Sequence, residues 1–237
     1  MMKYLNKYFR NSKSPLYSLI FITPLLLCYE FLIFKLNRSD INGIRNGADV
    51  LIRRIFHHLG IYGFYLVGFI VFISVFLAYY FRTKRVDKVK IDFNYFLLML
   101  FESCIYALVL IIILQKSSQY LSISSLFNSD FHLFIMALGA GIYEEFVFRV
   151  IMISAGIFFF HKLLKWNLNT SKILSIIISA LLFSIFHYLG KLGDAFAMRS
   201  FLLRTLAGLI LAIIYIFRGY GITVYTHTIY DLIIIYF

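Results

Sequence analysis

Long apolar runs dominate the chain, and short segments rich in basic residues separate most of them. A helix that crosses a bilayer needs about 20 mostly apolar residues. Seven runs approach this length, at residues 15–36, 59–81, 93–114, 131–160, 172–190, 201–217 and 220–237. The pattern predicts an all-α fold, a polytopic transmembrane helical bundle with about seven spans.

Two segments outside these runs have their own patterns. Residues 38–58 mix charged residues with apolar ones at helical spacing, the apolar positions being Ile44, Val50, Leu51 and Ile55. This pattern predicts an amphipathic helix at the membrane interface rather than a span. The basic N-terminus resembles the start of a signal peptide, but the apolar run after it is too long and lacks a small-residue cleavage site. We therefore expect a retained first span.

Composition supports lipid as the solvent of this chain. It is 62% hydrophobic and only 14% charged, whereas soluble domains carry about 25% charged residues. The net charge of +12 comes from basic residues placed between apolar runs, where lipid headgroups would meet them, so we expect membrane lipid and no nucleic acid as a partner. Both cysteines lie inside apolar runs, which argues against a disulfide framework.

The distribution of basic residues also predicts an orientation. If the N-terminus is inside, 13 lysines and arginines fall in inner segments and 7 in outer ones. The positive-inside rule then places the N-terminus in the cytoplasm.

Five acidic residues fall inside the apolar runs, where a charge costs at least about 2.5–3.5 kcal/mol at mid-bilayer. They are Glu30, Glu102, Glu144, Glu145 and Asp231. Glu145 and Arg149 stand four residues apart, so they share a helix face and can pair. Glu144 is rotated by about 100° from Glu145 on a helix and has no local partner. One glutamate is thus expected in a structural pair while its neighbour is free to act.

Two further runs each present polar groups from an apolar helix. His187 ends the fifth run, with Phe183 one turn earlier on the same face, and His227 and Asp231 share a face of the last run. Convergence of these groups with Glu144 would join two carboxylates and two imidazoles. Such a set can bind and deprotonate a water or hold a divalent metal.

The three patterns together resemble the signature of the CPBP family of intramembrane endopeptidases, which includes the CAAX prenyl endopeptidases and bacteriocin-processing proteases. The residues are Glu144-Glu145-x-x-x-Arg149, Phe183-x-x-x-His187 and His227-x-x-x-Asp231, in that order. The resemblance covers residues 131–237, which we interpret as a catalytic helical core. Residues 1–130 would form N-terminal membrane helices, about three spans and the amphipathic segment.

The resemblance implies hydrolysis of a peptide bond in a lipidated or membrane-anchored protein substrate. By motif position, Glu144 and His187 would activate the attacking water, while His227 and Asp231 would stabilise the oxyanion. Glu145, Arg149 and Phe183 would give structural support. We expect no cofactor, although a zinc-type site made by Glu144, His187, His227 and Asp231 is the alternative.

The role of Asp231 is open in three ways, because an ionised carboxylate cannot donate a hydrogen bond to an oxyanion. It is protonated, it orients a charged His227, or it ligates a metal. We favour the second, since a cationic imidazole stabilises developing negative charge.

The competing functions are a non-catalytic membrane scaffold of the same fold and a cation- or proton-coupled transporter. Transporters often show repeated halves, and none is visible here. The short chain without organelle signals favours a bacterial plasma membrane.

Overall fold

The computed structural model describes residues 2–36, 45–58, 91–115, 130–190 and 193–236, and the regular elements within these ranges are all helices. The all-α prediction is therefore confirmed. In chain order the elements are α1 (Met2–Ser12), α2 (Pro15–Lys35), α4 (Gly47–His58), α6 (Asn94–Gln115), α7 (Asp130–Gly139), η1 (Ala140–Glu144), η2 (Phe146–Ile153), α8 (Ser154–Ile157), η3 (Phe158–Leu163), α9 (Leu168–Phe186), α10 (Met198–Arg218) and α11 (Tyr220–Tyr236), the three η segments being π-helical.

Within the described residues, five helices are long and apolar enough to cross a membrane. They are Pro15–Lys35, Asn94–Leu114, Phe131–Leu163, Leu168–Phe186 and Met198–Arg218. The predicted run 59–81 lies outside the described residues, and α11 has only 17 residues. The expectation of about seven spans therefore slightly overstates the number that this structure supports.

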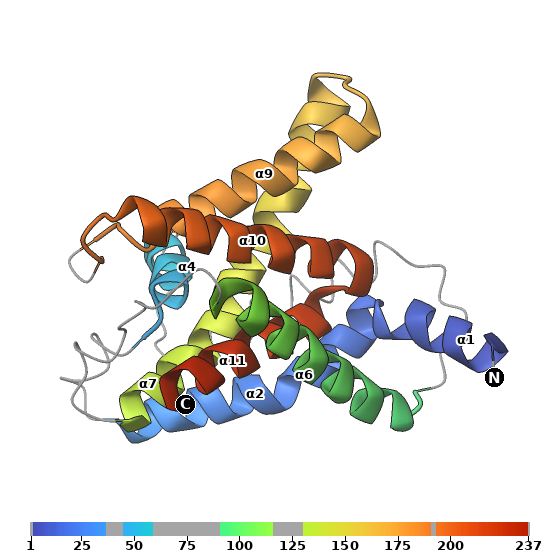
Figure 1. The fold of residues 1–237 in the computed structure, drawn as a ribbon, viewed down its shortest axis with the longest axis horizontal. Coiled ribbons are helices and arrows are strands. Elements are labelled where there is room, and N and C mark those ends of the chain that lie inside the picture. The colour runs from blue at the N-terminus through green and yellow to red at the C-terminus, as the bar shows by residue number, and fades with distance from the viewer. Residues whose placement is uncertain (1, 37–44, 59–90, 116–129, 191–192, 237) are drawn as a thin grey trace.

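The helices pack around α11, which places the last motif at the centre of the bundle. α11 contacts α2, α6, α10 and η1, while α9 packs along both α10 and η2. In Figure 1 the segments from α7 to η3 run from the lower left to the projecting tip at the top, and α9 returns beside them. Segments far apart in sequence thus meet where η1, α9 and α11 converge.

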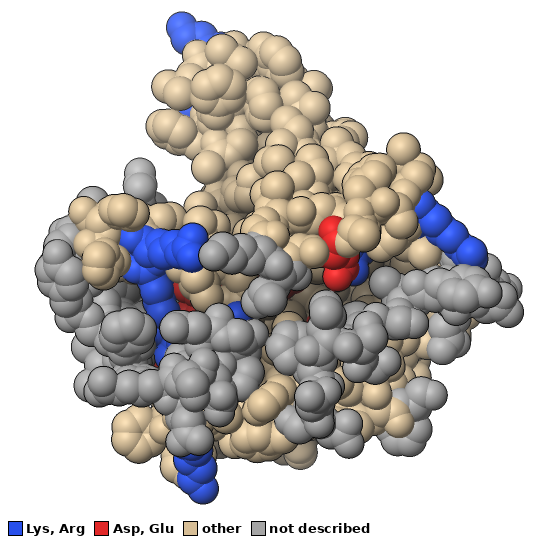
Figure 2. All heavy atoms as spheres, turned by 90° about the vertical axis from the view of Figure 1, so that its left-hand side faces the viewer, with Lys and Arg blue, Asp and Glu red and all other residues tan. Residues whose placement is uncertain are grey.

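The outer surface of the bundle is apolar. On α6 alone, Leu97, Phe101 and Ile112 are all more than half exposed, at 70%, 67% and 59%. Figure 2 shows mostly uncharged side chains over the described part of one face. The basic side chains of the projecting hairpin, which η3 and α9 form, gather toward its tip. Exposed apolar surface of this extent is unfavourable in water, and with the long apolar helices it indicates an integral membrane protein.

Helix α4 turns its polar side inward and its apolar side outward, the reverse of an amphipathic helix in a soluble protein. Its polar side faces the bundle, since Asp49 is 1% exposed and the preceding Arg45 and Asn46 are 6% exposed. Its apolar Leu51 and Ile55 face outward, at 39% and 51% exposure. An amphipathic helix is therefore present as predicted, although residues 38–44 lie outside the described residues. Its interfacial location stays a prediction.

A polar cluster ties α1 to α6 and to the end of α10. Arg218 at the C-terminal end of α10 pairs with Glu102 and donates to Ser12, 2.9 Å away. Tyr8 and Tyr106 also donate to Glu102, at 2.6 and 2.9 Å. Burial, together with this bond to the carboxylate, raises the pKa of the Tyr8 hydroxyl above its ordinary value. Glu102 is thus satisfied by partners away from the three motifs.

Gly141 allows α11 to pack directly against η1. A Cβ atom at this position would lie 2.9 Å from the carbonyl oxygen of Val224 and would overlap the hydroxyl of Thr228. Small residues at such contacts let membrane helices approach closely. The register of His227, next to Thr228, therefore depends on a glycine three residues before Glu144.

We expect Gly141→Ala to destabilise the protein, because overpacking a tight contact costs about 1–3 kcal/mol. The control is Gly208→Ala, where the nearest atoms to the new Cβ lie 3.2 Å away, on Ala180 and Phe183. Thermal unfolding in detergent should show a clear drop for Gly141→Ala and a smaller change for Gly208→Ala. Equal midpoints for both variants would contradict the packing argument.

Candidate active site

Glu144 and Glu145 lie in a stretch of π-helical backbone that runs from Ala140 to Ile153 with a single break at Glu145. The π-helix closes i→i+5 hydrogen bonds, and short π segments occur often at functional sites. Both glutamates are buried, at 5% and 0% exposure. The two adjacent carboxylates reach different partners, as the sequence predicts.

Two basic side chains, those of Arg149 and His227, contact the Glu145 carboxylate. Its Oε2 lies 3.0 Å from Nε of Arg149, and both side chains are fully buried. Its Oε1 lies 2.8 Å from Nδ1 of His227 on α11. The Arg149 contact is an ion pair without hydrogen-bond geometry, because no nitrogen of this guanidinium has a hydrogen-bond partner in the described part of the chain.

The ring of Phe183 contacts the side chains of Arg149, His187 and His227. The Arg149 guanidinium lies 4.6 Å from its centroid, which is a cation–π contact. The rings of His187 and His227 lie 5.0 and 6.0 Å from it, both edge-on. Phe183 thus packs against both imidazoles and supports Arg149.

Glu144 faces His187 across a gap. Its Oε1 accepts a hydrogen bond of 2.8 Å from the amide of Asn46 on the N-terminal side of α4. Its Oε2 has no hydrogen-bond partner among the described residues and lies 3.9 Å from Nε2 of His187. This distance is too long for a direct hydrogen bond and suits a bridging water.

The tautomer of His187 follows from its second nitrogen. Nδ1 lies 2.9 Å from the carbonyl oxygen of Phe183, which can only accept. The proton must therefore sit on Nδ1, and in the neutral ring Nε2 is an acceptor that faces Glu144. His187 is the more open partner, with 27% of its side chain exposed against 7% for Glu144.

His227 lies between two carboxylates. Besides the contact of Nδ1 with Glu145, its Nε2 lies 3.5 Å from Oδ2 of Asp231. A ring with a carboxylate at each nitrogen favours the doubly protonated, cationic form. This arrangement agrees with the interpretation that Asp231 orients a charged His227.

The structure brings together all of the motif residues that the sequence singles out. Glu144, Glu145 and Arg149 come from η1 and η2, Phe183 and His187 from α9, and His227 and Asp231 from α11. The pairing of Glu145 with His227 was not expected, since spacing suggested only Arg149 as its partner.

Asn46 and the polar side of α4 were also missed by the sequence reasoning. Arg45 and Arg53 both bind Asp49, at 2.6 and 2.5 Å. Arg53 also binds Glu30 of α2 at 2.8 Å, and the Tyr143 hydroxyl donates to the same Glu30 oxygen at 2.8 Å. Burial opposes the charge on Arg53, but the Asp49 and Glu30 carboxylates outweigh it and raise the pKa of this guanidinium. The four-residue spacing of Arg45, Asp49 and Arg53 was a signal that this side of the helix has protein partners.

Among the described residues, no three His, Cys, Asp or Glu side chains are grouped closely enough to hold a metal ion. Nδ1 of His227 contacts Glu145 and Nδ1 of His187 contacts a carbonyl, so in each ring Nε2 is the nitrogen that a metal would use. The zinc-type alternative made by Glu144, His187, His227 and Asp231 stays a prediction.

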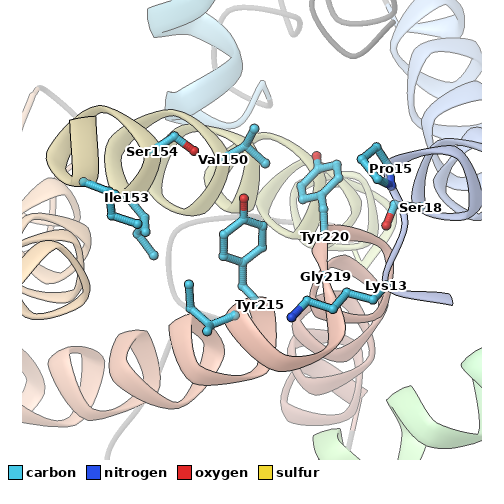
Figure 3. A pocket seen from close by; sticks show the side chains of 11 residues that line it. Lys13, Pro15, Ser18, Val150, Ile153, Ser154, Tyr215, Gly219 and Tyr220 are labelled. Carbon is cyan, nitrogen blue, oxygen red and sulfur yellow. The ribbon is translucent and has the colours of Figure 1, made fainter. Parts of the chain in front are cut away.

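A cavity of about 260 Å³ lies elsewhere in the bundle. Figure 3 shows its lining, which includes Lys13 and Ser18 beside the α10–α11 turn, with Val150 and Ser154 opposite. None of the seven motif residues lines it. The chemistry of the three motifs is therefore separate from this cavity.

Comparison with known families agrees with the assembled site. Residues 126–233 match the family model described as type II CAAX prenyl endopeptidase Rce1-like, an interval that contains all three motifs. The family resemblance expected from the motifs is thus confirmed for this region. The match supports a membrane endopeptidase in general terms. No curated protein and no solved structure matches the chain.

We expect Arg149→Met to destabilise the protein by about 3–5 kcal/mol, the usual cost of leaving one member of a buried ion pair without its partner. The double variant Glu145→Gln/Arg149→Met should recover part of this loss, because the uncompensated carboxylate is also removed. Thermal unfolding of the two single variants and the double variant measures the coupling. Strictly additive losses would show that the pair does not interact.

Proposed function

We propose that the protein is a membrane-embedded endopeptidase in which Glu144 and His187 activate a water. The observation that carries the proposal is the gap of 3.9 Å between Oε2 of Glu144 and Nε2 of His187. Oε2 is buried and has no hydrogen-bond partner among the described residues. A water in this gap would have an acceptor on each side, and a carboxylate is an effective base for its proton.

The first step is attack of this water on the scissile carbonyl carbon. Glu144 accepts one proton as the oxygen–carbon bond forms, and the carbonyl oxygen becomes an oxyanion. His187 accepts a second hydrogen bond from the water through Nε2, which fixes the direction of attack. Asn46 holds the other oxygen of Glu144 and keeps Oε2 directed at the gap.

The second step is collapse of the tetrahedral intermediate. The protonated Glu144 delivers its proton to the leaving amine nitrogen, the carbon–nitrogen bond breaks, and a new carboxyl group is released. His227 stabilises the oxyanion as a cationic donor. Its Nε2 is suited to this role because Asp231, 3.5 Å away, is near enough to favour the charged ring but beyond normal hydrogen-bond distance, so the N–H stays available to the oxyanion.

We infer that the substrate is a lipidated or membrane-anchored protein. The site lies on helices with lipid-facing outer surfaces, and the matched family is described by its action on CAAX prenyl proteins. The charge bias of the sequence supports a cytoplasmic N-terminus, and a bacterial plasma membrane is the proposed location.

We expect Glu144→Gln to abolish cleavage of membrane-anchored peptides, because the amide cannot take a proton from water. Turnover should fall by at least about 100-fold, the lower end of what general acid–base catalysis contributes. Cleavage by purified protein in detergent is the measurement, with thermal unfolding to confirm that the variant folds. Undiminished turnover would remove Glu144 from the mechanism.

The matched control is Asp92→Asn, which changes a carboxylate to its amide away from the three motifs. Oδ1 of Asp92 accepts from the backbone N–H of Asn94, and asparagine can do the same. Activity of this variant should equal that of the wild type. A chelator should leave wild-type turnover unchanged, and a loss that zinc reverses would replace this mechanism with a metal-dependent one.

We expect Asn46→Ala to lower kcat by on the order of tenfold, since hydrogen bonds to charged groups contribute about 1.5–3 kcal/mol. KM should change little, because Asn46 touches Glu144 and not the substrate. Asn46→Asp should be more damaging, since it places a second carboxylate beside Glu144. Asn169→Ala, at an exposed position on α9, is the control. A rise in KM with unchanged kcat would contradict a positioning role.

A further inference from the structure

A second polar cluster lies beside His187 and takes no part in the mechanism above. The backbone N–H of Asp194 donates to the carbonyl oxygen of His187, at 3.0 Å. The Asp194 carboxylate binds Nη2 of Arg204 on α10, at 2.5 Å. The Arg204 guanidinium lies 5.3 Å from the ring centroid of Tyr188, the residue after His187. Arg204 is therefore linked to His187 indirectly, through Asp194 and through Tyr188.

The cluster has more donors than acceptors. Nη1 of Arg204 and the hydroxyl of Tyr188 are both buried without a hydrogen-bond partner in the described part of the chain. Buried polar atoms in native proteins almost always have a partner, and each exception calls for an explanation. These two atoms thus offer donors to an acceptor from outside the described residues.

The charge distribution shows what kind of acceptor fits. The Arg204 side chain is only 12% exposed, while its counter-ion Asp194 is 42% exposed. The cation is thus held inside the protein and its single carboxylate partner lies toward the outside. A guanidinium has five N–H donors and matches the geometry of carboxylates, so it can bind a second carboxylate without giving up the first.

The cluster also lies near α11. Arg204 interacts electrostatically with His187 and with Tyr230, the neighbour of Asp231. Leu203, beside it on α10, belongs to the same apolar cluster as Tyr230. An anion at Arg204 would therefore lie within electrostatic range of His187.

We propose that Arg204 and Tyr188 form a subsite that binds a carboxylate of the substrate beside His187. The proposal rests on the proposed endopeptidase function and adds a specificity determinant to it. Nη1 of Arg204 and the hydroxyl of Tyr188 both donate to the carboxylate, while Nη2 stays with Asp194. The carboxylate comes either from the C-terminus of the substrate or from an acidic side chain near the cleaved bond.

Binding to the Glu144→Gln protein tests the subsite without turnover. Three membrane-anchored peptides of otherwise equal sequence serve as probes: a free acid, its C-terminal amide, and the amide with one glutamate near the terminus. We expect the free acid or the glutamate peptide to bind at least about tenfold more tightly than the plain amide. Whichever of the two binds tightly identifies the source of the carboxylate.

Substitutions then show which residues produce the preference for a carboxylate. In the Glu144→Gln background, Arg204→Gln should abolish the preference and leave binding of the plain amide unchanged. Tyr188→Phe keeps the ring under Arg204 and should weaken the preference several-fold. Arg199→Gln, which changes an exposed arginine of the same helix, should have no effect. If Arg204→Gln fails to fold, Tyr188→Phe still tests the carboxylate preference.

The outcomes separate the subsite from the endopeptidase. Equal binding of all three peptides, or equal weakening of all three by Arg204→Gln, overturns the subsite even if the wild type cleaves them. A carboxylate preference that depends on Arg204, in a protein whose wild type cleaves none of the peptides, supports the subsite and counts against the endopeptidase.

Discussion

Burial of charge in an apolar environment is the constraint on which this structure depends. A carboxylate within a membrane helix needs a partner, because neither lipid nor an apolar core solvates it. Glu30 binds Arg53, Glu102 binds Arg218, and Glu145 binds Arg149 and His227. Each of these contacts joins different helices or different turns, so neutralising the charges also fixes the register of the bundle.

Glu144 is the exception, and its neighbour explains how the exception is tolerated. No lysine or arginine pairs with it among the described residues; it has one amide donor and an imidazole across a gap. Glu145, one residue later, anchors the same backbone to α11 through His227. The π-helical segment is therefore held in place by one glutamate, while the other keeps an oxygen that has no hydrogen-bond partner among the described residues. Such a division lets a site contain a base without leaving the surrounding fold under-stabilised.

The sequence predicted the parts of the site that follow helical spacing. Glu145–Arg149 and His227–Asp231 are four-residue pairs, and the structure has both. Spacing within one helix cannot show which helices meet, so the contact of His227 with Glu145 was missed. Asn46 was missed for another reason: apolar residues were taken as the informative side of α4, whereas its polar side is the one that packs. The number of spans was overstated because the length of each apolar run was counted without knowing where the helix within it ends. The last run illustrates this, since its helix α11 has only 17 residues.

The N-terminal helices complete the site although the family match begins only at residue 126. Asn46 reaches Glu144 because α4 is held against α2: the Tyr29 hydroxyl donates to Asp49, and Arg53 binds Glu30. Gly139 contributes as well, since a Cβ there would lie 2.9 Å from the Cβ of Asn46 and 2.8 Å from the ring of Tyr29. The outward side of α4 carries Leu51 and Ile55, which need an apolar environment. If the predicted location of α4 at the membrane interface holds, lipid would favour the same orientation of α4 that directs Asn46 toward Glu144.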